Sequence, residues 1–302
     1  MRVHHEVESF AKPFPVDAAR ALRRTAVPGA DPCARAAHDG TWRTSRTPEG
    51  PATVRVADRP DAVVAEAWGP GAAWLMAQVP AMVGLRDDRA GFDPSAVPLV
   101  AELARRRPGF RIGGSDRLVE ALIPTVLGQR VASVEAARSY RALIRAFGGP
   151  APGPADLPLP PDPVRLARLA AFQFHRFGVE ANRATTIIGI CRRARSIDRL
   201  TERPVADGAR ALATLPGVGP WTTTTVRGLV WGDPDAAVVG DYNLPHAVAW
   251  VLAGEPRATD ERMLELLAPF AGHRGRVQQL VVSQGGPPRR APHARLQPLS
   301  RM

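Results

Sequence analysis

Residues 215–222 read LPGVGPWT and lie between two segments with helical periodicity. Gly217 and Gly219 allow a tight turn that brings bare backbone N–H groups to the start of the second helix, where the helix dipole favours an anion. The stretch is therefore a candidate phosphate clamp. A plain connection between two helices, with glycine as the C-cap and proline before the next helix, is the commoner origin of a lone GxG pattern.

About twenty residues further on, residues 238–244 read VVGDYNL, and their one carboxylate belongs to Asp241. The Asp241 carboxylate follows a short apolar stretch and precedes an amphipathic helix. We therefore expect it to be partly desolvated and able to stabilise a developing positive charge. Asp241 is also a good N-cap residue. The two roles are compatible because a cap fixes the side chain. Asp233 and Asp235, in a Gly-Asp-Pro-Asp stretch, are expected to be plain turn residues.

Composition limits the class of protein. The chain has 302 residues, which suggests roughly two domains, and its 45% hydrophobic content is typical of a globular protein. Cys33 and Cys191, the two cysteines, lie far apart without CxxC spacing, which excludes a cysteine-ligated iron–sulfur cluster or zinc site and disfavours a disulfide framework. No apolar run is long enough to span a membrane and the N-terminus lacks a secretory layout, so we expect a cytoplasmic, nucleoid-associated protein.

The formal net charge is +11, and Lys12 is the sole lysine among 40 basic residues. Codon bias accounts for part of such an arginine excess. A polyanion partner is the other interpretation, because guanidinium groups pair with phosphates in a bidentate way.

The pattern changes along the chain. Residues 1–84 contain short alternating runs that predict three antiparallel strands at 40–46, 53–56 and 63–68, with helices near 16–25 and 71–83, which make a small α+β domain. Residues 85–284 are predicted to form an all-α domain, because Leu and Ala recur there at helical intervals. Its helices are expected near 95–107, 115–129, 132–147, 163–173, 180–196, 206–214, 221–231, 243–253, 259–270 and 273–283.

Two segments interrupt this pattern. The Pro- and Gly-rich residues 148–163 are predicted to form a loop between helices rather than a linker between domains. Residues 285–302 contain no acidic residue and are predicted to form a disordered basic tail.

The hairpin and the later Gly-Asp together resemble the helix–hairpin–helix, Gly/Pro-rich loop and Asp signature of base-excision DNA glycosylases. Residues 107–111 (RPGFR), 122–132 (LIPTVLGQRVA) and 178–184 (GVEANRA) resemble segments of the bacterial 3-methyladenine DNA glycosylase II family. The resemblance covers most of residues 1–283, strongly from residue 95. It implies an α+β domain followed by an all-α helix–hairpin–helix glycosylase domain.

The resemblance also implies roles for individual residues. Asp241 corresponds to the catalytic aspartate, the amides of Gly217 and Gly219 hold a phosphate, and Trp221 lines the base pocket. Trp221 has a plain alternative as a core residue at a helix start. An indole face would attract a cationic alkylated purine by about 0.5–2 kcal/mol. The further DNA-binding residues implied in this way are Leu215, Thr222, Gln129 and Arg130.

Three positions depart from the family pattern. Arg130 stands where well-known members have a leucine that wedges into the duplex, Thr225 stands where a pocket tyrosine is often found, and His273 replaces a tryptophan. These departures leave the shape of the pocket and the substrate open.

Trp221 also occupies the position of the lysine nucleophile in bifunctional members, so Schiff-base lyase chemistry is not supported. We therefore expect a monofunctional DNA glycosylase that flips a damaged base out of double-stranded DNA and hydrolyses its N-glycosidic bond. The alternatives are a non-enzymatic protein that binds distorted DNA and a glycosylase for oxidised or deaminated bases. No cofactor, metal or membrane partner is expected, apart from a monovalent cation that the hairpin carbonyls could hold, and the chain is expected to be a monomer.

Overall fold

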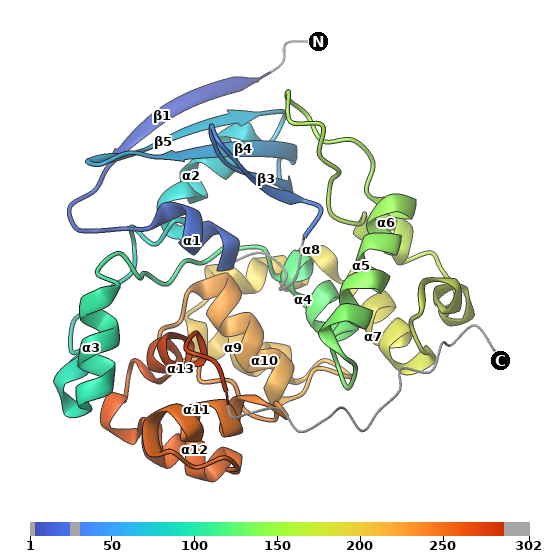
Figure 1. Ribbon diagram of the computed structural model, residues 1–302. Coiled ribbons are helices and arrows are strands. Elements are labelled where there is room, and N and C mark those ends of the chain that lie inside the picture. The colour runs from blue at the N-terminus through green and yellow to red at the C-terminus, as the bar shows by residue number, and fades with distance from the viewer. Residues whose placement is uncertain (1–3, 25–30, 287–302) are drawn as a thin grey trace. The chain divides into compact units, whose positions relative to one another are not determined.

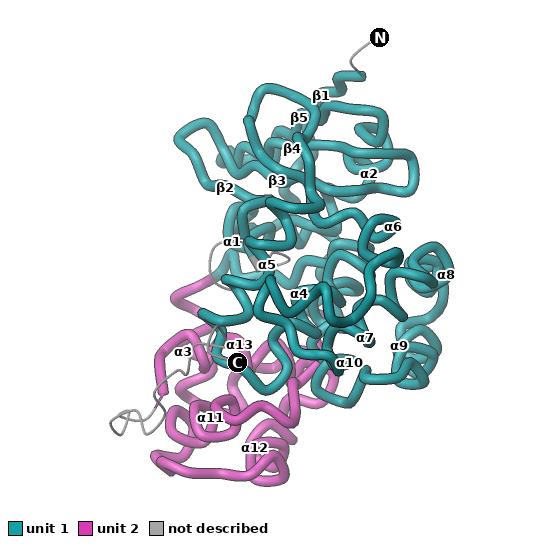
Figure 2. Tube along the Cα trace, turned by 90° about the vertical axis from the view of Figure 1, so that its right-hand side faces the viewer, with its two compact units in different colours: residues 1–89, 108–233 teal, residues 90–107, 234–302 magenta. Residues whose placement is uncertain are grey.

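The computed structural model describes residues 4–24 and 31–286, and the chain forms two compact units (Figure 2). Unit 1 contains residues 1–89 and 108–233, and unit 2 contains residues 90–107 and 234–302. The sequence analysis placed a boundary near residue 84, whereas the contacts group residues 1–89 with the helices up to residue 233. The expected basic tail falls almost entirely outside the described residues.

The first layer of unit 1 is an antiparallel sheet of the strands β1 (His5–Ala11), β2 (Ala34–Ala37), β3 (Gly40–Thr47), β4 (Gly50–Asp58) and β5 (Ala62–Trp68). Their order across the sheet is β1-β5-β4-β3-β2. Figure 1 labels the first four strands of this order. The three strands expected from sequence are confirmed as the centre of the sheet. Both edge strands were missed, because β2 has only four residues and β1 is mostly exposed.

Alternation along the strands decides which face is buried. Val54 and Val56 of β4 are buried, whereas Arg55 between them lies opposite Glu66 of β5 and forms an ion pair with it. The apolar face packs against α2 (Ala72–Met82), while α1 (Ala18–Arg24) contacts β4 and β3. The α+β character predicted for this part of the chain is confirmed.

The helical layer of unit 1 is built around α4 (Leu118–Leu127), which is apolar on nearly every side. The other helices of this layer are α5 (Ser133–Phe147), α6 (Pro163–Leu166), α7 (Ala181–Arg192), α8 (Ala194–Asp198), α9 (Val205–Ala213) and α10 (Pro220–Val226). Of these, α4 contacts α5, α7, α8 and α10. The single helix expected at 163–173 was wrong in its extent, since α6 ends early and a 3-10 helix follows at Ala171–Phe177.

Residues 148–162 form a loop between α5 and α6, as expected, and the sheet holds this loop through side-chain hydrogen bonds. The hydroxyl of Thr44 donates to the carbonyl of Pro158 (2.6 Å), and that of Thr53 donates to the carbonyl of Pro152 (2.5 Å). Arg46 donates from Nε to the carbonyl of Pro160 (2.8 Å). The loop therefore joins the sheet to the helical layer.

Unit 2 is helical and has its own core. Its helices are α3 (Pro98–Arg106), α11 (Leu244–Ala253), α12 (Asp260–Leu267) and α13 (Arg274–Val282). Val100, Val248, Met263 and Val277 are fully buried in one cluster drawn from these four helices. Within the described residues, no helix has the length and apolarity needed to cross a membrane.

Candidate nucleic-acid interface and active site

The hairpin between α9 and α10 has a conformation that its glycines allow. Gly217 has φ +81°, in the left-handed region, and a β-carbon there would lie 2.0 Å from the hydroxyl of Thr186 on α7. Val218 is buried, and its N–H closes the turn on the carbonyl of Leu215 (3.0 Å). Within the described residues the N–H groups of Gly217 and Gly219 have no acceptor. The hairpin thus presents two free donors next to the start of α10, as a phosphate clamp requires.

Gln129 connects the hairpin to the end of α4. Its side-chain amide donates from Nε2 to the carbonyl of Gly217 and to the hydroxyl of Thr222, both at 2.9 Å. The indole of Trp221 lies on the same side, since a β-carbon on Gly128 would be 3.5 Å from its tip. The structure therefore brings together the residues that the sequence placed at the end of α4 and in the hairpin.

Arg130 follows in an unusual conformation. Its φ is +57° and its side chain is exposed, so this arginine occupies a left-handed position that a non-glycine residue rarely adopts. Arg183 stabilises the end of α4 just before this turn. Its side chain is 4% exposed and donates to the carbonyl of Leu127 (2.8 Å). Arg183 also forms an ion pair with Glu180 at 3.3 Å. The support fixes the end of α4 and leaves Arg130 at the surface.

Three other predicted site residues are less accessible. Leu215 is half-buried against the core of the helical layer. Thr222 is 1% exposed and its hydroxyl is engaged by Gln129. Thr225 lies on α10 with a buried hydroxyl that has no hydrogen-bond partner in the described part of the chain. The side chains of Leu215 and Thr222 therefore support the hairpin rather than extend from it.

Asp241 lies in unit 2 at the start of α11. Its Oδ1 accepts hydrogen bonds from the N–H groups of Asn243 (2.7 Å) and Leu244 (3.0 Å). These bonds fix the carboxylate at the start of α11. The N-cap residue of α11 is Asn243, so the sequence prediction of Asp241 as the N-cap was wrong by two positions. Its Oδ2 accepts no hydrogen bond from any described residue. The side chain is half-buried, so one oxygen is anchored and the other is available for chemistry.

An aromatic residue that the sequence analysis did not single out follows directly. Tyr242 is 79% exposed, and its ring meets the edge of His246 with centroids 5.8 Å apart. The signal available in the sequence was a large aromatic side chain immediately after the candidate catalytic aspartate.

His273 has a different environment from that expected of a pocket residue. It is 6% exposed, its Nε2 lies 2.9 Å from the carbonyl of Ala90, and its Nδ1 accepts from Nε of Arg276 (3.2 Å). Its ring also lies against Phe92, with centroids 5.2 Å apart. These contacts occupy both ring nitrogens within unit 2.

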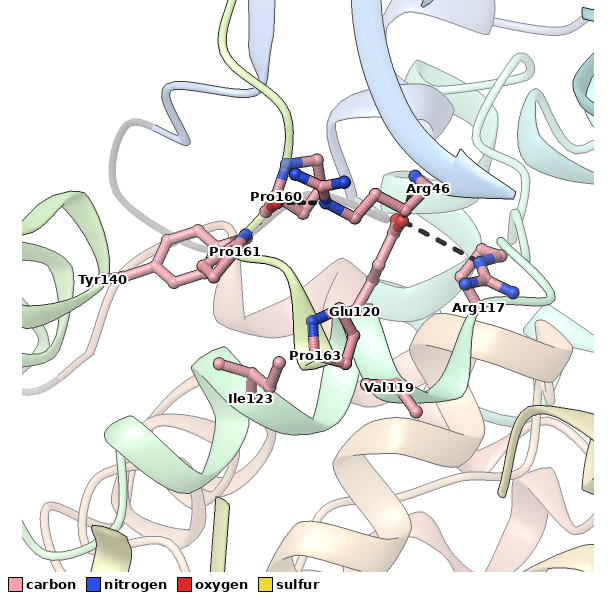
Figure 3. A pocket seen from close by; sticks show the side chains of 9 residues that line it. All are labelled: Arg46, Arg117, Val119, Glu120, Ile123, Tyr140, Pro160, Pro161 and Pro163. Carbon is pink, nitrogen blue, oxygen red and sulfur yellow. Dashed lines mark hydrogen bonds and ion pairs between the residues drawn. The ribbon is translucent and has the colours of Figure 1, made fainter. Parts of the chain in front are cut away.

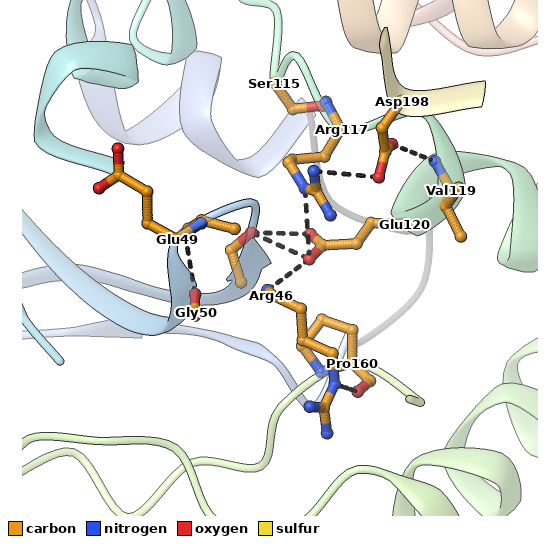
Figure 4. Close-up of polar contacts among 11 residues, drawn as sticks. Arg46, Glu49, Gly50, Ser115, Arg117, Val119, Glu120, Pro160 and Asp198 are labelled. Atoms are coloured by element: carbon orange, nitrogen blue, oxygen red, sulfur yellow. Dashed lines mark hydrogen bonds and ion pairs between the residues drawn. The ribbon is translucent and has the colours of Figure 1, made fainter. Parts of the chain in front are cut away.

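Unit 1 also contains a small pocket, away from the hairpin, between β3, the first turns of α4 and the loop before α6 (Figure 3). Glu120 at its edge accepts from the N–H of Arg46 (2.6 Å) and the hydroxyl of Ser45 (2.9 Å). Arg117 forms an ion pair with Asp198 at 3.0 Å, as Figure 4 shows.

Burial raises the pKa of Asp198, and Arg117 opposes that effect. Asp198 also accepts from the N–H of Val119 at the start of α4 (3.0 Å). These charged groups are engaged with one another across the sheet and the helical layer. The pocket is thus part of the junction between the sheet and the helical layer of unit 1.

Comparison with curated proteins finds a relative by sequence. DNA-3-methyladenine glycosylase from Bacillus subtilis (strain 168) is 28% identical over 181 residues, which cover 58% of this chain and 59% of that protein. The match therefore spans less than two thirds of the relative's length. No family model matches the chain.

Solved structures match over nearly the whole chain. The 3-methyladenine DNA glycosylase from Archaeoglobus fulgidus has a TM-score of 0.78 at 14% identity, covering 92% of this chain and 99% of that one. The 8-oxoguanine glycosylase/lyase from Clostridium acetobutylicum has a TM-score of 0.68 at 13% identity, covering 93% and 98%. In complex with double-stranded DNA, that protein scores 0.59 at 14% identity, covering 83% and 97%. The predicted resemblance to this glycosylase fold is confirmed, and the fold is shared by proteins named for different damaged bases.

Proposed function

We propose that this protein is a monofunctional DNA glycosylase that removes alkylated bases of the 3-methyladenine type. The observation that carries the proposal is the half-buried carboxylate of Asp241, which is held through Oδ1 at the start of α11 while Oδ2 remains unengaged by the described residues. A fixed carboxylate with one open oxygen suits the stabilisation of a positive charge on a sugar. The name of the Bacillus subtilis relative supports the class of substrate.

The reaction follows from the chemistry of an alkylated purine. Methylation at a ring nitrogen leaves the base cationic, so the C1′–N bond breaks with its electron pair passing to the base, which departs neutral. The sugar becomes an oxocarbenium-like cation, and Asp241 stabilises it until the oxygen of a water molecule adds at C1′ and releases its proton. No general acid is required for a base that is already cationic, so the single carboxylate of Asp241 suffices in this proposal. The base must first leave the helical stack, because its glycosidic bond is otherwise enclosed in the duplex.

The hairpin binds the DNA backbone in this proposal. The free N–H groups of Gly217 and Gly219 suit a backbone phosphate, and Gln129 fixes the hairpin against the end of α4. Arg130, exposed on the adjoining turn, would enter the gap left by the flipped nucleotide. Tyr242 adds an exposed aromatic ring beside Asp241, a surface on which a planar base can stack.

The number and position of the lysines support a glycosylase without lyase activity. Lys12 is the sole lysine, and its Nζ lies 2.7 Å from Asp58 and donates to the carbonyl of Arg59 (2.9 Å). That side chain is 10% exposed and follows directly after β1. Position 221, where bifunctional relatives are expected to carry the nucleophile, is tryptophan. A Schiff base formed by a lysine at the hairpin is therefore not part of the proposal.

A second candidate is a glycosylase for oxidised bases. The specific observation in its favour is the structural match to a protein named 8-oxoguanine glycosylase/lyase over 93% of this chain. Thr225 in place of the expected tyrosine is compatible with a pocket for a base other than 3-methyladenine.

The experiment that tests the proposal measures released bases. Duplexes carrying methylated, oxidised or deaminated bases are incubated with the protein, and the free bases are identified by mass spectrometry. We expect methylated purines to be released. Release of 8-oxoguanine alone would favour the second candidate, and binding of every duplex without release of any base would indicate a non-enzymatic DNA-binding protein.

A further inference from the structure

The segment that leads to Asp241 has no regular secondary structure. Residues 234–241 lie between unit 1 and α11 in the sequence, and no helix or strand is formed within them. A carboxylate at the end of such a segment has no sheet ladder to fix its position. The contacts that hold this segment therefore decide where Asp241 stands.

One face of α13 provides most of these contacts. The backbone N–H of Arg276 donates to the carbonyl of Pro234 (2.8 Å), and the guanidinium of Arg274 donates from Nε to Asp235 (2.8 Å). Gly275 allows the helix to approach closely, because a β-carbon there would lie 2.6 Å from the carbonyl oxygen of Ala236. The expectation that Asp235 is a plain turn residue was wrong in this respect, since it anchors the segment to α13.

Gln278 lies one turn further along the same face of α13. Its Oε1 accepts from the N–H of Val238 (2.9 Å), and its Nε2 donates to the carbonyl of Val238 (3.0 Å). The same Nε2 also donates to the sulfur of Met263 on α12 (3.2 Å). Gln278 is 2% exposed. The side-chain amide of Gln278 thus pairs with both backbone groups of Val238, as a neighbouring strand would in a sheet. Val238 lies three positions before Asp241.

A second hydrogen bond fixes the segment at Gly240, two residues after Val238. Gly240 has φ +75°, and its N–H donates to the carboxylate of Asp260 at the start of α12 (2.7 Å). The chain is thereby fixed at positions 238 and 240, and Asp241 follows at once with its own bonds to α11. The backbone has little freedom left between Gln278 and the carboxylate.

We infer that Gln278 is a positioning residue for Asp241, acting through the backbone of Val238. The inference rests on the proposed function, because it gives Asp241 the role of stabilising the sugar cation. Removing both hydrogen bonds would leave the N–H and the carbonyl of the half-buried Val238 without these partners, and the segment would shift to regain them. A shift of about 1 Å in a reacting group can cost a factor of about one hundred in rate.

The test replaces Gln278 by methionine, which keeps the length of the side chain and removes its hydrogen bonds. Gln279→Met is the matched control on the same helix, because the side-chain oxygen of Gln279 is buried without a partner. Single-turnover base excision, affinity for undamaged duplex and thermal melting are measured for both variants. We expect Gln278→Met to excise about 10- to 100-fold more slowly with duplex affinity unchanged, and Gln279→Met to stay within about two-fold of the parent.

Two further readouts separate positioning from a general loss of fold. In a protein that already carries Asp241→Asn, Gln278→Met should lower the residual rate by less than about two-fold, because the charge it positions is gone. Hydrogen exchange of the peptide covering 234–242 should accelerate in Gln278→Met and not in Gln279→Met.

Several results would overturn the inference. The first is a Gln278→Met protein that excises at the parental rate. The second is an equal loss of excision rate from Gln278→Met in the parent and in the Asp241→Asn protein. The third is an unchanged rate of hydrogen exchange over residues 234–242. A parent protein that releases no base would refute the proposed function instead. The exchange measurement would still decide whether Gln278 holds the segment.

Discussion

Replacing Asp241 by asparagine removes the charge of the candidate catalytic group while keeping its shape. The oxygen of an asparagine side chain can accept the same two hydrogen bonds, from the N–H groups of Asn243 and Leu244. The start of α11 should therefore persist, and we expect thermal stability within about 1 kcal/mol of the parent. Only the electrostatic contribution of the carboxylate to the transition state is lost.

The size of that contribution follows from Coulomb's law. A carboxylate about 4 Å from a developing unit charge, at an effective dielectric constant of about 20, stabilises it by about 4 kcal/mol, which corresponds to about three decades of rate. Because Asp241 is half-buried rather than enclosed, we expect a loss of two to four decades in single-turnover excision.

Binding should respond in the opposite way. The hairpin donors of Gly217 and Gly219 are unaffected, and removing a negative charge weakens repulsion from the phosphates. Duplex affinity should stay the same or rise. The matched control is Asp61→Asn, which makes the same change in net charge at an exposed turn between β4 and β5.

The assay follows release of a methylated base under enzyme excess, together with binding by fluorescence anisotropy and thermal melting. A folded Asp241→Asn protein that excises at the parental rate would refute the catalytic role and leave the aspartate only its hydrogen bonds at the start of α11. A rate loss of equal size in Asp61→Asn would assign the effect to net charge.

Three further changes test other parts of the structure. Arg130→Ala should weaken binding and excision of damaged DNA more than binding of undamaged duplex, and equal losses would reduce this residue to a phosphate contact. Gly217→Ala should destabilise the fold by about 1–2 kcal/mol, because alanine is disfavoured at φ +81° and its β-carbon would collide with a threonine of α7. Gly219→Ala is the control and should melt at the same temperature as the parent, since Gly219 has φ −91° and open space around it. Burial acts to raise the pKa of Asp235, but hydrogen bonds from Arg274 outweigh it and hold that pKa below its ordinary value. This stabilisation is present above about pH 3.9 and is lost as the pH falls through the lowered pKa, so urea titrations should show Arg274→Gln less stable than the parent at pH 6 and a smaller difference at pH 3.

The sequence predicted those parts of the fold that local patterns encode. Alternation in residues 53–56 identified β4, and the recurrence of Leu and Ala at helical intervals in residues 115–129 identified α4. Both signals are strong because most residues of these two elements are buried. The edge strands β1 and β2 bury little, so the period-2 signal is weak there. The grouping of residues 90–107 with residues 234–302 depends on contacts between distant segments, which no local pattern records.

The candidate site divides in the same way. The turn at the hairpin glycines and the local hydrogen bonding of Asp241 before α11 were predictable, because each depends on a few neighbouring residues. The exact N-cap position was not, since it falls on Asn243. The bonds from Gln129 to the hairpin and from Gln278 to Val238 join residues 88 and 40 positions apart. Asp235 was correctly expected in a turn, but its partner Arg274 lies 39 residues away. Side-chain contacts over such separations become visible only in the folded chain.

The central claim is that the protein hydrolyses one glycosidic bond and leaves the DNA strand whole. It is tested most directly by the intact mass of both strands of a duplex carrying a single alkylated purine, recorded before and after incubation without heat or alkali. Hydrolysis predicts that the damaged strand loses the mass of the free base and gains that of one water molecule, with the sugar-phosphate backbone unbroken. An unchanged damaged strand, or a strand broken at the lesion with an unsaturated sugar at its new end, would contradict the claim.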